Sequence, residues 1–229
     1  MTAPESDLAA VADATAQLLD TAAGLGPAEL AAPSLLPNWS RGHVLAHLSR
    51  NADALTRVLA GQPMYPDEEA RNTDIERDAP RPPTAQLDDL RTSSERFLTA
   101  ARALDEQRWA EVVALRNGVT DLASSLPFRR WVEVELHHID LGAGRTVAEL
   151  PGAFLDRALR YLADRFAGNP ALPPIELRAE DGRHWRTGGA EGESRTVAGT
   201  PAALVGWLSG RTPGSGLTSA EPLPELPPL

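Results

Sequence analysis

Apolar residues follow a helical repeat over much of the first 166 positions of this chain. Apolar side chains recur every three or four residues, which is the spacing of one face of an α-helix. Glycine, proline and capping residues interrupt this pattern at intervals. The pattern predicts helices over residues 5–23, 41–60, about 84–103, 127–142 and 151–166. Five helices of this kind are typical of a bundle.

The predicted helix boundaries follow from local chemistry. Ser40 is a good N-cap for the second helix, and Thr84 is placed to cap the third. Pro127 suits the first turn of the fourth helix, which ends at Gly142. The proline-rich and highly charged segment 61–83 is expected to be a surface loop.

The character of the chain changes after Gly168. Short strands are expected, with Asp181-Gly182 as a hairpin turn, followed by a short helix ending at Leu208. The predicted strands cover residues 175–178, 184–186 and 194–197. The tail from Pro213 carries five prolines and is expected to be disordered.

These elements predict an α+β protein with an N-terminal helical bundle and a small C-terminal α+β domain. The predicted domains are residues 1–168, which hold the bundle, and 169–212, which hold the α+β domain. Residues 213–229 form the proline-rich tail.

The composition excludes several classes of function. A formal net charge of −10 argues against nucleic acid and acidic membrane surfaces as partners. No apolar run approaches the roughly 20 residues of a membrane helix, and no secretory signal is visible, so a cytoplasmic location is expected. All 22 basic residues are arginine and cysteine is absent, which removes lysine and cysteine chemistry. Any sulfur chemistry therefore needs a thiol from another molecule.

Histidine and glutamate residues on two predicted helices form a candidate metal site. Glu133 and His137 are four residues apart, and so are His43 and His47, so each pair lies on one helix face. A glutamate and a histidine from one helix with a histidine from the other make the three-ligand set of a catalytic zinc site. The spacing does not choose between His43 and His47. Asp140, one turn past His137, is placed to orient a ligand.

The alternative is that these pairs are ordinary polar helix faces and that each histidine is structural. Two observations favour a site. His47 lies in an apolar stretch, where an unpartnered imidazole is costly. His137 shares its helix with the apolar residues of a predicted core.

Two segments resemble the signatures of the mycothiol-dependent maleylpyruvate isomerase family, which belongs to the DinB-like metalloenzymes. Residues 37–55, PNWSRGHVLAHLSRNADAL, resemble its first signature helix, and residues 130–142, RWVEVELHHIDLG, resemble the second. The C-terminal segments 180–182 and 205–211 resemble the small domain of the same family. The resemblance covers nearly the whole chain except the tail.

The resemblance implies a DinB-like four-helix-type bundle in which His47, Glu133 and His137 bind Zn²⁺, one ion per chain. It thereby selects His47 over His43, and it places a functional arginine at Arg211. A glycine–arginine pair at a helix end is equally typical of a C-cap. The resemblance further implies mycothiol, a small thiol of actinobacteria, as the thiol cofactor. The reaction that it implies converts maleylpyruvate to fumarylpyruvate. The partners expected are this thiol and a small-molecule substrate, with the protein as a monomer.

Other residues are candidates for the reaction itself. Arginines are suited to the carboxylates of the substrate because of their planar fork. The candidates are Arg50, Arg129, Arg130 and Arg211, and the candidate proton carriers are Tyr65, Glu135 and Asp140.

Two rival functions remain open at this stage. A mycothiol S-transferase would use the same metal and thiol on another electrophile, adding the thiol without expelling it. A bundle that binds a small molecule or a partner, without catalysis, would need no open metal position.

Overall fold

The computed structural model describes residues 3–67 and 69–228. The chain divides into two compact units, Met1–Ala143 and Gly144–Leu229, and each is described by itself. The first unit is helical with one small hairpin, and the second combines helices with a three-stranded sheet. The predicted α+β class, with an N-terminal helical domain and a small C-terminal sheet domain, is confirmed.

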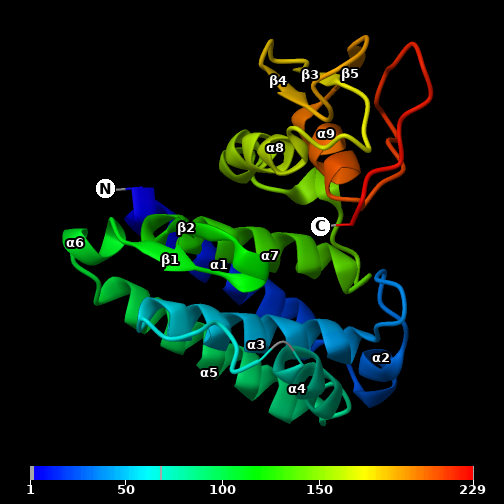
Figure 1. Ribbon diagram of the computed structural model, residues 1–229. Coiled ribbons are helices and arrows are strands. Elements are labelled where there is room, and N and C mark those ends of the chain that lie inside the picture. The colour runs from blue at the N-terminus through cyan, green and yellow to red at the C-terminus, as the bar shows by residue number, and fades with distance from the viewer. Residues whose placement is uncertain (1–2, 68, 229) are drawn as a thin grey trace. The chain divides into compact units, whose positions relative to one another are not determined.

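Four helices form the bundle of the first unit: α1 (Ala3–Ala23), α3 (Arg41–Leu59), α5 (Pro83–Arg102) and α7 (Leu126–Asp140). Helix α3 packs against α5 and α7, and α1 packs against the same two helices (Figure 1). The centre of the bundle is filled by fully buried apolar side chains. They include Leu18, Leu45, Leu48, Leu90, Phe97 and Leu126. This core fixes the distance between α3 and α7, which carry the candidate ligands.

The boundaries of the bundle helices follow the predicted signals, with one exception. Ser40 is the N-cap of α3, and its hydroxyl accepts a hydrogen bond from the amide of His43. The first turn of α7 contains Pro127, as predicted. The prediction of Thr84 as the cap of the third helix is wrong, because α5 begins one residue earlier at Pro83. A proline in the first turn costs no hydrogen bond and starts the helix without a side-chain cap.

The prediction of a surface loop over 61–83 is wrong for part of that segment, which holds helix α4 (Ala70–Asp78). Helix α4 packs on α3. It buries Ile75, its single large aliphatic residue, together with the carboxylate of Asp78. That carboxylate is held by Arg77 at 2.8 Å and Arg81 at 2.6 Å. Polar contacts of this kind leave no helical apolar repeat in the sequence.

The remaining elements of the first unit are short. Helices α2 (Pro27–Ala31) and α6 (Glu106–Trp109) flank the bundle helices in the chain. Strands β1 (Val112–Ala114) and β2 (Thr120–Leu122) form an antiparallel hairpin in which Val113 faces Asp121. The sequence made no prediction for this hairpin.

The second unit holds α8 (Gly152–Phe166), β3 (Ile175–Ala179), β4 (His184–Thr187), β5 (Arg195–Gly199) and α9 (Pro201–Leu208). The strand order is β4-β3-β5, with β4 antiparallel and β5 parallel to β3. The three predicted strands and both helices are present. Thr200 caps α9 by accepting a hydrogen bond from the amide of Ala203 at 3.1 Å.

The division between the units falls earlier than the predicted boundary at residue 168. Helix α8 packs against α9 and β4, so its apolar face belongs to the second unit and not to the bundle. Phe154 and Leu159 are fully buried there. The structure also differs from the expected disorder at the start of the tail, because Thr218 pairs with Ala198 and Glu221 forms an ion pair with Arg195.

Within residues 3–67 and 69–228, every helix is too short or too polar to span a membrane.

Candidate metal centre

Helices α3 and α7 bring His47, Glu133 and His137 together in the first unit. The Nε2 atom of His47 lies 3.0 Å from Oε2 of Glu133, and the Nε2 atom of His137 lies 3.3 Å from the same oxygen. The two imidazole rings meet edge to face with their centroids 4.6 Å apart. One donor atom from each residue lies within 4.8 Å of the other two.

The local structure explains how each side chain reaches this point. Glu133 and His137 are one turn apart on α7, so their side chains project from the same face. His47 lies on α3 among buried residues, at a position where α3 packs on α7. The spacing on α7 provides two donor atoms, and the packing of α3 on α7 brings the third donor, the imidazole of His47, to the same point.

Asp140 orients one of the two imidazoles. Its Oδ2 atom lies 2.8 Å from Nδ1 of His137, and the carboxylate is buried. A carboxylate in this position accepts the Nδ1 proton and holds the ring so that Nε2 faces Glu133. The predicted placement of Asp140 beside His137 is thus what the structure has.

The electrostatics of the cluster favour neutral His47 and ionised Glu133. Burial, together with the charge of His137, lowers the pKa of His47 to about 4. Burial alone would raise the pKa of Glu133, but hydrogen bonds from His137 and His47 hold it well below its usual value. Burial would likewise lower the pKa of His137, but hydrogen bonds to Asp140 and Glu133 raise it above the usual value.

These residues fit a zinc ion by their donor chemistry. Two imidazole nitrogens and a carboxylate oxygen are the ligand types of a catalytic zinc site with one open position. Ligands about 2.0–2.1 Å from a tetrahedral zinc lie about 3.3 Å from one another. The Nε2–Oε2 distances of 3.0 and 3.3 Å are close to that spacing.

His43 does not join the cluster, although it lies one turn before His47. Its Nδ1 atom lies 2.7 Å from the Ser40 hydroxyl, and its Nε2 atom lies 3.3 Å from Oε2 of Glu76 on α4. A hollow of about 680 Å³ beside His43 is lined by none of the three clustered residues. The spacing left open whether His43 or His47 joins Glu133 and His137. In the structure, the ring of His47 points toward Glu133 and the ring of His43 points toward Ser40 and Glu76.

The other predicted arginines are occupied elsewhere. Arg50 forms ion pairs with Asp89 at 2.6 Å and Asp53 at 3.3 Å, and Arg129 pairs with Asp121 at 2.7 Å.

Arg130 is fully buried, and its guanidinium donates to the Leu48 carbonyl and to Asn51 Oδ1, each at 2.8 Å. Burial lowers its pKa to about 10, which leaves it charged at neutral pH. This arginine therefore braces α7 against α3 and is enclosed by protein.

Two further predicted residues have polar partners of their own. The carboxylate of Glu135 is buried and accepts a hydrogen bond from the Trp131 indole at 3.1 Å. Arg211 belongs to the second unit, where it follows α9 and donates to the Ser209 carbonyl at 2.6 Å. Its role in the reaction stays a prediction.

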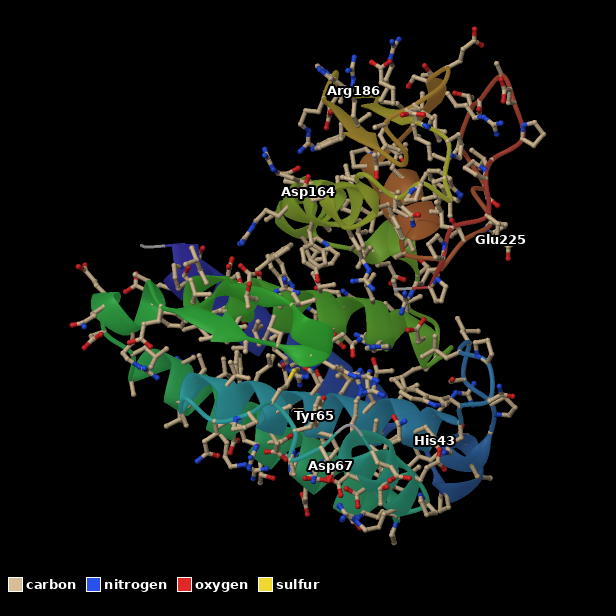
Figure 2. All side chains as sticks on the ribbon, in the orientation of Figure 1. His43, Tyr65, Asp67, Asp164, Arg186 and Glu225 are labelled. Atoms are coloured by element: carbon tan, nitrogen blue, oxygen red, sulfur yellow. The ribbon has the colours of Figure 1, made fainter. Side chains whose placement is uncertain are left out.

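Arg71, which no sequence pattern indicated, lies on α4 and points toward the cluster. Its Nη2 atom lies 3.2 Å from Nδ1 of His47, and its guanidinium carbon lies 6.0 Å from the centroid of the Trp39 ring. Tyr65 interacts with both Arg71 and Glu133, and burial raises its pKa. Figure 2 marks Tyr65 and His43 at separate points of the first unit. Because segment 61–83 was predicted to be a loop, nothing in the sequence placed Arg71 beside α3.

Comparisons with known proteins agree with this fold. The family model of the mycothiol maleylpyruvate isomerase N-terminal domain matches residues 11–142, and the model of the MDMPI C-terminal domain matches residues 149–228. A solved mycothiol-dependent maleylpyruvate isomerase is 29% identical, with a TM-score of 0.86 over 99% of this chain and 97% of that chain. A histidine-to-alanine mutant of such an isomerase is 28% identical, with the same TM-score and coverage. A comparison with curated proteins found no match. The chain therefore belongs to the mycothiol maleylpyruvate isomerase family of enzymes.

Proposed function

We propose that this chain is a zinc- and mycothiol-dependent isomerase that converts maleylpyruvate to fumarylpyruvate. The observation that supports it most directly is the convergence of His47, Glu133 and His137 on one point in a chain without cysteine. The solved relatives are described as mycothiol-dependent maleylpyruvate isomerases, which supplies the substrate and the thiol of this proposal.

In the proposed site, His47, Glu133 and His137 hold the zinc ion, and Asp140 keeps His137 in the ligating orientation. When bound, zinc lowers the pKa of a thiol that coordinates it, so that a thiolate forms at neutral pH. A free thiol titrates near 8.5, so without this help only a small share is ionised at pH 7. The protein supplies no thiol of its own, and mycothiol fills that role.

The proposed reaction has three steps that leave the thiol unchanged. The mycothiol thiolate adds to the cis double bond of maleylpyruvate, and the electron pair moves into the conjugated carbonyl as an enolate. The former double bond is then a single bond and rotates. Collapse of the enolate expels the thiolate and leaves the trans isomer, so that no atom is gained or lost overall.

The remaining predictions from the sequence accompany this proposal. The cytoplasmic location, the monomeric state and the catalytic role of Arg211 stay predictions.

The test is an assay of metal-quantified protein on maleylpyruvate, with and without mycothiol. We expect about one zinc per chain and isomerisation only when the thiol is present. His47→Ala should lose zinc and activity while keeping its helix content. His43→Ala is the matched control, because it removes an imidazole one turn away on the same helix and should keep the zinc.

The outcomes separate the proposal from its alternatives. Zinc and mycothiol binding without isomerisation would contradict the isomerase and favour an S-transferase that acts on another electrophile. Unchanged zinc content in His47→Ala would overturn the ligand assignment.

A further inference from the structure

Arg71 stands beside the metal centre but is not one of its ligands. Its guanidinium reaches His47 with one nitrogen and Asn72 Oδ1, at 3.0 Å, with another. The Trp39 ring lies under the guanidinium at a cation–π distance, and Tyr65 lies close by. Arg71 is half-buried, so its charge is only partly solvated.

The charge of Arg71 has no acidic partner among residues 3–67 and 69–228. No carboxylate oxygen in those ranges lies within 4.0 Å of its nitrogens, whereas Arg77 and Arg81, on or next to the same helix, both pair with Asp78. A half-buried guanidinium without a carboxylate is costly and is typical of a site that receives an anion. Its planar fork matches a carboxylate with two parallel hydrogen bonds.

The contact between Arg71 and His47 is poorly suited to a metal-loaded site. An imidazole that binds a metal through Nε2 carries its proton on Nδ1 and needs an acceptor there. His137 has such an acceptor in Asp140, at 2.8 Å. His47 instead faces Arg71, which can only donate. With Nε2 of His47 on a metal, the hydrogen bond from Arg71 is lost and the guanidinium is available to another acceptor.

We propose that Arg71 is a substrate-binding residue that holds a carboxylate of the electrophile beside the metal centre. The inference rests on the proposed function, which supplies a substrate with two carboxylates. Trp39 and Tyr65 flank the guanidinium beside His47, so a carboxylate bound by Arg71 lies next to this residue of the cluster.

The direct test measures binding of maleate, a cis dicarboxylate, to zinc-loaded protein by titration calorimetry. Replacing the fork by Arg71→Met should weaken maleate binding by about 10- to 100-fold, the range for a charge-assisted hydrogen-bonded pair. Arg71→Lys keeps the charge but loses the planar fork, so its affinity for maleate should lie between those of the wild type and Arg71→Met. Arg91→Met is the control, because Arg91 pairs with Asp88 on the exposed face of α5, and this variant should bind maleate like the wild type.

Zinc content separates a binding role from a structural one. All three variants should keep the wild-type zinc content. The proposal would be overturned if Arg71→Met lost its zinc or bound maleate as tightly as the wild type. It would also be overturned if Arg91→Met lost as much maleate affinity as Arg71→Met. The absence of saturable maleate binding to the wild type would overturn it as well.

A kinetic measurement separates this inference from the proposed function. With maleylpyruvate and mycothiol, Arg71→Met should raise KM for maleylpyruvate by about 10-fold or more, with little change in KM for the thiol. Wild-type protein that binds maleate through Arg71 but isomerises nothing would refute the proposed function alone. An active enzyme whose KM is unchanged in Arg71→Met would refute the role of Arg71 alone.

Discussion

The Nδ1 atom of His137 lies 2.8 Å from Oδ2 of Asp140, one turn further along α7. Glu133, His137 and Asp140 belong to one continuous helix. The helix backbone therefore holds the imidazole of His137 between the carboxylates of Glu133 and Asp140. The imidazole is thereby oriented before any ligand arrives, with its Nε2 atom 3.3 Å from Glu133.

Replacing Asp140 by asparagine should weaken zinc binding by about 10- to 100-fold, the usual effect of losing an acceptor behind a ligating histidine. A chelator competition assay measures the affinity directly. Asp121→Asn is the control, because Asp121 pairs with Arg129 and lies outside the cluster. Equal zinc affinities in the two variants would show that Asp140 does not orient His137.

Zinc binding should release a proton from His137 in a defined pH window. Metal binding needs all three ligands deprotonated. At neutral pH, His47 is already deprotonated, because its pKa is about 4, and so is Glu133, because its pKa is lowered. The pKa of His137, in contrast, is raised. Proton release should therefore be present below that raised pKa and disappear as the pH rises through it.

Calorimetry of zinc binding in buffers of different ionisation enthalpy counts the released protons. Asp140→Asn removes one cause of the raised pKa of His137, so the window should move to lower pH. Release that grows with increasing pH would contradict the assignment, and so would an unchanged window in the variant.

Gly42→Ala should destabilise the first unit. A Cβ atom at Gly42 would lie 2.3 Å from the backbone oxygen of Ala79, so α3 and the end of α4 would have to move apart. Such overpacking costs about 1–3 kcal/mol of unfolding free energy, which urea denaturation measures. In Gly152→Ala, a new Cβ meets no atom within 4 Å, and this control should be neutral or slightly stabilising. Equal stability of both variants would refute the close approach.

Arg130→Met should destabilise the bundle through its lost hydrogen bonds. Asn51 Oδ1 is a buried acceptor of Arg130, and an unsatisfied buried acceptor costs about 1–3 kcal/mol. Arg129→Met is the neighbouring control, since its ion pair with Asp121 is partly exposed and worth about 1 kcal/mol or less. Urea denaturation of the two variants gives the comparison. An equally small change in both would show that Arg130 is not a brace.

The sequence predicted those features that depend on neighbours in the chain. The apolar repeats predicted the four bundle helices and α8, and Ser40 and Pro127 marked two helix starts. The i,i+4 spacing of Glu133 and His137 placed both on one face of α7, because the helical repeat fixes that geometry without tertiary contacts. The same reasoning placed Asp140 one turn beyond His137.

Features that depend on packing between distant segments could be read only from the folded chain. Spacing could not choose between His43 and His47, because both lie within one turn of α3. The packing of α3 on α7 turns His47 toward Glu133, while Ser40 and Glu76 hold His43. Helix α4 was missed because it has no apolar stripe. Ile75 and the buried Asp78, paired with Arg77 and Arg81, hold this helix on the bundle. Arg71 reaches the candidate metal centre through that helix, so its position follows from the packing of α4 on α3.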